Sequence, residues 1–111
     1  MDDNPVSIEA GGITLEGNLS VPEGATGVVL FAHGSGSSRH SRRNRYVARV
    51  LNEAGLATLL MDLLTAEEER IDAVTGHLRF DIGFLAGRLV SATGWLMAQP
   101  ATRELPIGYF G

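Results

Sequence analysis

A run of glycine and serine directly follows an apolar segment near the start of the chain, and such a run supports three kinds of chemistry. The segment from Gly27 to Ala32 is apolar, and His33-Gly34-Ser35-Gly36-Ser37-Ser38 comes next. Small residues let backbone amides approach a ligand closely. The run could therefore cradle a phosphate, hold a dinucleotide, or stabilise an oxyanion during acyl transfer.

Phosphate binding by a P-loop requires a lysine after the second glycine of its motif. All nine basic residues of this chain are arginine, so that motif is absent. The same observation excludes a lysine general base and a Schiff-base lysine within these residues.

A Rossmann-like dinucleotide site is an incomplete match. Gly34 and Gly36 follow a predicted strand, and Asp62 ends the next one, where a ribose-binding acid would lie. However, Arg39 replaces the third glycine, and the next predicted helix does not open directly from the glycines. The segment before Gly27 also has no place in a Rossmann unit, which opens with the glycine-bearing strand. A Rossmann-like nucleotide-binding unit remains a weaker alternative.

Hydrophobic periodicity predicts the strands that position this loop. Residues 6–9 and 13–19 alternate apolar and polar around Gly11-Gly12, which predicts a β-hairpin with one solvated face. The apolar runs 28–32 and 57–61 predict strands covered on both faces. Residues 106–111 predict a last strand.

The helices follow from capping residues and apolar stripes. Ser41 predicts the N-cap of a helix of about thirteen residues that stops before Gly55. A longer helix is expected from about His77 to Gln99, and residues 65–76 are expected as an exposed loop or short helix. The stripe of the longer helix comprises Leu78, Ile82, Leu85, Leu89, Ala92 and Leu96, and the aromatic residues expected to pack beside it are Phe80, Phe84 and Trp95.

These elements predict an α/β fold of order β-β-β-α-β-α-β. Strands that alternate with helices favour a largely parallel sheet after the hairpin. We expect residues 1–111 to form one partial domain.

Composition narrows the possible partners. A net charge of −4 disfavours nucleic acid, and the absence of cysteine excludes disulfides and thiolate metal sites within the chain. The three histidines lack metal-ligand spacing, so neither a metal nor a cofactor is expected. The apolar runs are too short to span a bilayer, and the acidic start does not resemble a secretory signal. A cytoplasmic location is therefore expected, with no membrane partner.

The combination of hairpin, strand ending His33-Gly34, Gly/Ser loop, helix and strand ending Asp62-Leu63 resembles the α/β-hydrolase superfamily, in particular its dienelactone-hydrolase-like branch. The resemblance covers the whole chain but only the amino-terminal half of such an enzyme. It implies that the strand at 106–111 precedes the nucleophile elbow G-x-S-x-G, with Gly111 as its first glycine. The implied function is a serine hydrolase that acts, when complete, on small-molecule esters or lactones.

The resemblance also implies roles for the loop residues. Ser35 and Gly36 would donate backbone amides to the oxyanion, and His33, Gly34 and Arg39 would lie against the substrate. Neither Ser35 nor Ser37 lies in G-x-S-x-G, so neither is expected to be the nucleophile. The simpler alternative is that Gly34 and Gly36 only turn the chain.

Four arginines and one aspartate near this loop have two interpretations each. Arg39, Arg42, Arg43 and Arg45 could attract an anionic substrate or form a solvated helix start. Asp62 is expected to accept hydrogen bonds from a neighbouring loop and not to be the triad acid, which follows the nucleophile in this fold.

A second class of hypothesis is a non-catalytic fragment or half-domain that assembles with another chain. The nucleophile, the acid and the final histidine of the family are not assigned within residues 1–111, so the isolated chain is expected to be inactive. The strand at 107–110 would leave an open sheet edge, which predicts self-association or a carboxy-terminal partner chain.

Overall fold

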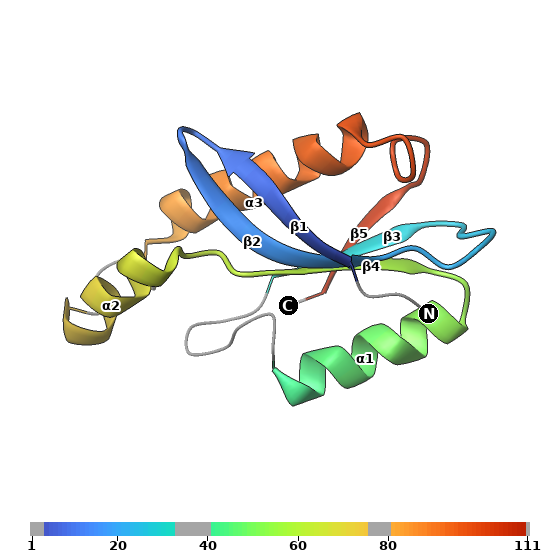
Figure 1. Ribbon diagram of the computed structural model, residues 1–111, viewed down its shortest axis with the longest axis horizontal. Helices are drawn as coiled ribbons and strands as arrows, with labels where there is room; N and C mark the ends of the chain where they lie inside the picture. Colours follow the sequence, from blue (N-terminus) through green and yellow to red (C-terminus); the bar gives the residue numbers. More distant parts are fainter. Residues whose placement is uncertain (1–3, 33–40, 76–80, 111) are drawn as a thin grey trace.

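The computed structural model of the protein describes residues 4–32, 41–75 and 81–110, which form one five-stranded sheet with a helix packed on each face (Figure 1). The strand order is β1-β2-β4-β3-β5. The elements in chain order are β1 (Asn4–Ala10), β2 (Ile13–Ser20), β3 (Val28–Phe31), α1 (Arg42–Glu53), β4 (Ala57–Met61), α2 (Ala66–Thr75), α3 (Ile82–Ala98) and β5 (Ile107–Phe110).

The predicted hairpin is confirmed, and its turn explains why two glycines are needed. Ala10 pairs with Ile13, and Gly11 and Gly12 between them have φ values of 60° and 88°. A two-residue turn with positive φ at both positions matches the twist of the flanking strands, and glycine adopts it without strain. Along β1, Ile8 and Ala10 are buried while their neighbours Ser7 and Glu9 are exposed.

The sheet is mixed, and its parallel part agrees with the prediction. β4 pairs parallel with β3, and β3 pairs parallel with β5. β2 pairs antiparallel with both β1 and β4. The hairpin therefore extends a parallel three-stranded unit.

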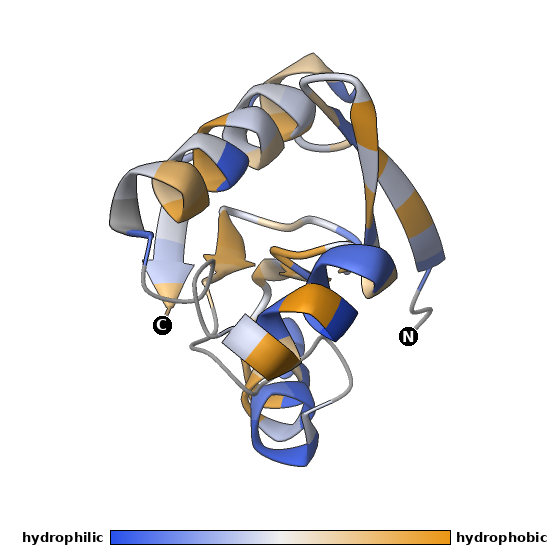
Figure 2. Ribbon diagram, turned by 90° about the vertical axis from the view of Figure 1, so that its left-hand side faces the viewer, coloured by the Kyte–Doolittle hydropathy of each residue, from blue (hydrophilic) through white to orange (hydrophobic). Residues whose placement is uncertain are grey.

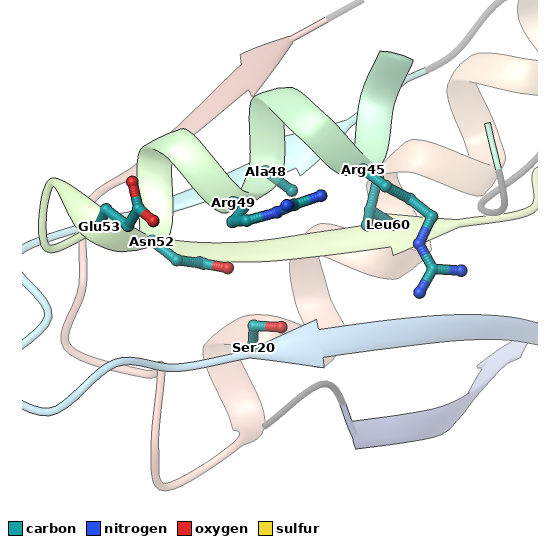
Figure 3. Close-up of a pocket in the computed structure, with 7 residues that line it drawn as sticks. All are labelled: Ser20, Arg45, Ala48, Arg49, Asn52, Glu53 and Leu60. Atoms are coloured by element: carbon teal, nitrogen blue, oxygen red, sulfur yellow. The ribbon is translucent and has the colours of Figure 1, made fainter. Parts of the chain in front are cut away.

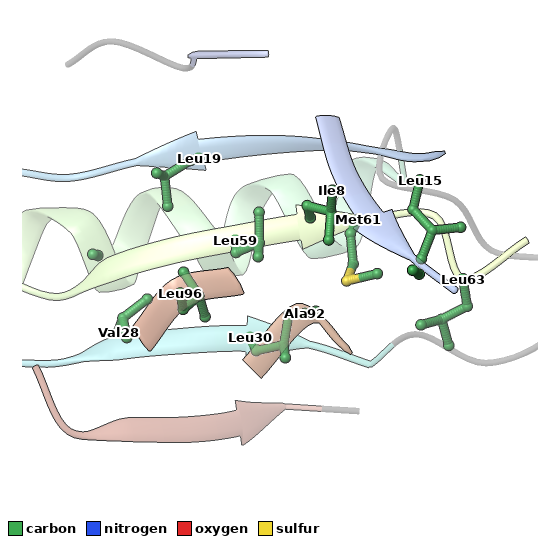
Figure 4. Packing of buried hydrophobic residues seen from close by; sticks show 12 residues of the cluster. Ile8, Leu15, Leu19, Val28, Leu30, Leu59, Met61, Leu63, Ala92 and Leu96 are labelled. Atoms are coloured by element: carbon green, nitrogen blue, oxygen red, sulfur yellow. The ribbon is translucent and has the colours of Figure 1, made fainter. Parts of the chain in front are cut away.

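β3 is buried on both faces, as its apolar run predicts. Phe31 packs with Leu60 and Ala48 in a small cluster beneath α1. The opposite face carries the larger cluster beneath α3, which contains Ile8, Ala10, Leu15, Leu19, Val28, Leu30, Ala57, Leu59, Met61, Leu63, Ala92 and Leu96 (Figure 4). Figure 2 shows the apolar strand segments lying between the two helical layers.

α1 begins and ends at the residues that the sequence indicates. The Ser41 hydroxyl accepts a hydrogen bond from the Asn44 amide at 3.4 Å. At the other end Gly55, with φ of 90°, donates to the Asn52 carbonyl, and Leu56 donates to the Leu51 carbonyl. This pair of bonds is the Schellman motif, which satisfies the last carbonyls of a helix.

The predicted element order and one predicted boundary need correction. Residues 66–75, expected as an exposed loop or short helix, form a helix, so two helices and not one separate β4 from β5. α3 begins at Ile82 rather than near His77, because the Asp81 carboxylate caps it by accepting from the Phe84 amide at 3.0 Å. His77, Leu78 and Phe80 lie outside the described residues.

The apolar stripe of α3 is confirmed where it is described. Ala92 and Leu96 are fully buried, and Leu85, Leu89 and Trp95 pack against the same cluster. In the described ranges, none of the helices has the length and apolar character needed to cross a membrane.

Candidate functional site

The strand order identifies the sheet edge where a ligand would bind. From β3 the chain passes through α1 on one face to β4, and from β4 it returns past β3, with α3 on the other face, to β5. The strand order therefore reverses at β3. Open α/β sheets bind ligands outside the carboxyl ends of their strands at such a reversal. The candidate site lies at the carboxyl end of β3.

The carboxyl ends of β3 and β5 are held together at this edge. Phe31 is in register with Phe110, and their ring centroids are 5.2 Å apart at a tilt of 53°. The Ala32 amide also donates to the Phe110 carbonyl at 2.7 Å. The carboxyl ends of β3 and β5 therefore lie next to each other.

The predicted loop residues His33, Gly34, Ser35, Gly36 and Arg39 all fall outside the described ranges, so their roles stay predictions. The structure describes β3, the strand that precedes these residues in the sequence. Arg42 and Arg43, from the predicted arginine cluster, are exposed in the first turn of α1. Asp62 directly follows β4 and is half-buried, and its amide donates to the Glu16 carbonyl at 2.9 Å.

A buried arginine of α3 forms hydrogen bonds to residues 63–68, the segment that follows β4. Arg88 of α3 is 8% exposed, and its Nη1 donates to the Leu63 carbonyl at 2.9 Å. Its Nη1 and Nη2 also donate to the two carboxylate oxygens of Glu68, at 2.9 and 2.7 Å. The guanidinium carbon lies 4.3 Å from the centre of the Phe84 ring. A fork-to-fork pair of this kind fixes both position and orientation.

Glu68 at the same time completes a capping box at the start of α2. Its Oε1 accepts from the Thr65 amide at 2.9 Å, and its own amide donates to the Thr65 hydroxyl at 3.1 Å. Residues 63–68 are thus tied to α3 next to the candidate edge. Sequence reasoning missed this cluster, although Thr65-x-x-Glu68 is a capping-box pattern and Arg88 interrupts an apolar stripe.

Hydrogen bonds from Arg88, more than any other cause, hold the pKa of Glu68 below its usual value of 4.5, and burial opposes them. A carboxylate whose pKa is lower in the folded state stabilises the fold above its unfolded pKa. We expect the free energy of unfolding to fall as pH drops below about 4.5 and through the lowered pKa of Glu68. Chemical denaturation of Glu68→Gln at several pH values should show a smaller fall, whereas Glu67→Gln, at an exposed neighbour, should keep the wild-type fall.

A groove of about 420 Å³ lies between α1 and the strands β2 and β4 (Figure 3). Its lining residues are Ser20, Arg45, Ala48, Arg49, Asn52, Glu53 and Leu60. The amide nitrogen of Asn52 donates to the Leu56 carbonyl and the Thr58 hydroxyl, so this side chain joins α1 to β4. Because its described lining residues come from α1, β2 and β4 and none from β3, we do not place the reaction there.

Within residues 4–32, 41–75 and 81–110, no three potential metal-ligating side chains come together. The described part of the site therefore consists of strand ends, the Phe31–Phe110 contact and the Arg88–Glu68 pair.

Comparison with known sequences gives two close relatives and no matching family model. Proteins from two strains of Mycobacterium tuberculosis, provisionally named phosphoribosyl transferases, are each 60% identical over 109 residues. The match covers 98% of this chain but 24% of those proteins. The chain thus spans about a quarter of the curated relatives that it matches.

Comparison with solved structures points to hydrolases. A dienelactone hydrolase from Anabaena variabilis superimposes with a TM-score of 0.96 and 65% identity, over 99% of this chain and 51% of that enzyme. An α/β hydrolase from Penicillium sp. sh18 superimposes with a TM-score of 0.77 at 21% identity, over 98% of this chain and 37% of that one. The second likeness supports the fold alone. The chain has the fold of the amino-terminal half of an α/β-hydrolase of the dienelactone hydrolase type.

Proposed function

We propose that this chain is the oxyanion-loop half of a serine hydrolase that acts on ester or lactone bonds when the fold is complete. The observation that carries the proposal is the likeness to the Anabaena dienelactone hydrolase, at 65% identity and a TM-score of 0.96 over 99% of the chain. The chain spans about half of that enzyme, so the reaction belongs to the complete fold.

The chemistry proposed for residues 33–36 is stabilisation of a developing negative charge. Attack on an ester carbonyl creates a tetrahedral intermediate whose oxygen becomes an oxyanion. Backbone amides that are fixed beforehand around this oxygen lower the barrier, because they need no reorganisation during the reaction. On one side of the oxyanion, the backbone amides of Ser35 and Gly36 would donate from the loop that follows β3. The residue after the nucleophile, which follows β5 in the complete fold, would donate from the other side.

The β3–β5 junction supports this division of roles. Phe31 and Phe110 pack together where both strands end, so the oxyanion loop and the segment after β5 would start side by side. An acyl-transfer site needs this proximity, because both donors and the nucleophile must address one carbonyl.

Phosphoribosyl transfer is the second candidate, and only the name of the mycobacterial relatives favours it. Those proteins are about four times as long as their match, which covers 24% of them. Three quarters of each relative therefore lies outside the region shared with this chain. We propose that the name reflects that other region, and that residues 1–111 carry the hydrolase half.

The test is a chimera in which residues 1–111 are joined to the remaining half of the Anabaena enzyme. We expect the chimera to hydrolyse p-nitrophenyl acetate and a dienelactone, and the isolated 111-residue chain to give no rate above buffer. The chimera should not release diphosphate from a phosphoribosyl diphosphate donor. A folded chimera with the parent enzyme's circular dichroism but no hydrolysis would contradict the proposal.

A further inference from the structure

The groove between α1, β2 and β4 lies away from the candidate reaction site (Figure 3). Ser20, which lines the groove, is in register with Thr58 near the amino end of β4, whereas the candidate reaction site lies at the carboxyl end of the parallel neighbour β3. In the strand order β1-β2-β4-β3-β5, a strand added beyond β5 would be separated from β4 by β3 and β5. The groove is therefore a feature of this half of the fold and not of the edge at β5.

Two largely buried side chains offer the groove oxygen atoms that the described residues leave unused. Ser20 and Asn52 are each 8% exposed. Asn52 donates both of its amide hydrogens, to the Leu56 carbonyl at 2.9 Å and to the Thr58 hydroxyl at 3.2 Å. Neither the Asn52 Oδ1 nor the Ser20 hydroxyl is hydrogen-bonded to another described residue, and neither oxygen is fully enclosed. Both oxygens are therefore available to a molecule in the groove.

Two arginines one helical turn apart give the groove a positively charged end. Arg45 and Arg49 line it, and Figure 3 shows both side chains extending from α1 toward β4. Glu53, the acidic residue among the described lining residues, follows Arg45 by two turns, about 12 Å along the helix axis. Glu53 and Arg49, both described, form no ion pair with each other. The chain as a whole has a net charge of −4, so the groove attracts anions against the overall charge.

We propose that this groove binds a small phosphate monoester that also carries hydroxyl groups, such as a sugar phosphate. Arg45 and Arg49 hold the phosphate, because planar guanidinium groups match its oxygens and remain charged. The Asn52 Oδ1 can only accept a hydrogen bond, so it pairs with a hydroxyl of the ligand and not with a second anionic group. The Ser20 hydroxyl donates to or accepts from the same part of the ligand. A volume of about 420 Å³ is in the range of small-molecule sites.

The test is calorimetric titration of the 111-residue chain with glucose 6-phosphate, inorganic phosphate and glucose. We expect one glucose 6-phosphate per chain, with a dissociation constant about tenfold or more below those of phosphate and glucose, because only the ester reaches both the arginines and the oxygen atoms. The chimera with the Anabaena half should bind it equally, since the groove is remote from β5. Equal affinity for phosphate and glucose 6-phosphate would overturn the proposal, as would binding that the chimera lacks.

Three variants locate the binding. Arg49→Met should weaken glucose 6-phosphate binding by about tenfold or more, because hydrogen bonds to charged groups are strong. The matched control is Arg103→Met, which removes the same charge from an exposed arginine outside the groove and should leave binding unchanged. Ser20→Ala should weaken glucose 6-phosphate by about fivefold and leave inorganic phosphate unaffected. Equal weakening by Arg49→Met and Arg103→Met would show attraction by net charge alone and overturn the proposal. Because binding is read without hydrolysis, an inactive chimera counts against the proposed function and not against this site.

Discussion

In the chimera of residues 1–111 with the second half of the Anabaena enzyme, we expect Ser35→Pro to lower kcat by about two to three orders of magnitude and Ser35→Ala to keep most of the activity. Proline has no backbone N–H to donate, and loss of one oxyanion donor costs about 10²- to 10³-fold. Alanine keeps the amide and removes only the hydroxyl. The effect should fall on kcat more than on KM, because the oxyanion exists in the transition state and not in the bound ester.

Steady-state kinetics with p-nitrophenyl acetate measures both variants, and thermal unfolding checks that Ser35→Pro still folds. Ser37→Pro is the control, because it places a proline in the same loop at a different position. Gly24 is not a suitable position for such a control, because its φ is 73° and the proline ring cannot adopt a positive φ. Equal losses in Ser35→Ala and Ser35→Pro would assign the role to the side chain and contradict the backbone mechanism.

Arg88→Met is expected to destabilise the fold by about 3 kcal/mol, because it leaves the Glu68 carboxylate half-buried without its cation. The same change removes the hydrogen bond that fixes the Leu63 carbonyl. A loss of this size is a large part of the total stability of a domain, which is about 5–15 kcal/mol.

Denaturant unfolding, with Arg103→Met as a control at an exposed arginine, measures this effect. The double variant Arg88→Met with Glu68→Leu should recover part of the loss, since an apolar pair can replace an ion pair once neither charge remains. An Arg88→Met protein as stable as Arg103→Met would show that the pair contributes only what a surface salt bridge does.

The strands were predictable because their signals are local. Gly11-Gly12 between alternating residues specifies a two-residue turn, and the run from Val28 to Phe31 lacks a polar face because both faces of β3 are covered. The start of α3 was not predicted correctly because the apolar stripe runs past Asp81, whereas the boundary is set by the capping bond to the Phe84 amide. α2 was left open between loop and helix, since its run of acidic residues has no apolar stripe.

The site was predictable only in part. The sequence alone places the Gly/Ser run directly after the predicted strand at 28–32, and the structure adds that this strand, β3, lies where the strand order reverses. The roles proposed for the loop residues stay predictions. The Arg88–Glu68 pair was not foreseen, because its partners are 20 residues apart and meet only through tertiary packing. An arginine within the stripe that contains Leu85 and Ala92 was the one signal of a buried counter-charge.

The most direct test of the proposed serine-hydrolase site is labelling of the chimera by a serine-directed phosphonate, followed by peptide mass spectrometry. The phosphonate reacts with a serine that an assembled oxyanion site activates. We expect one labelled serine, located after residue 111, slower labelling in the Ser35→Pro chimera, and no label on the isolated chain. Stoichiometric label on Ser35, Ser37 or any other serine of residues 1–111, or a folded chimera that takes up no label, would contradict it.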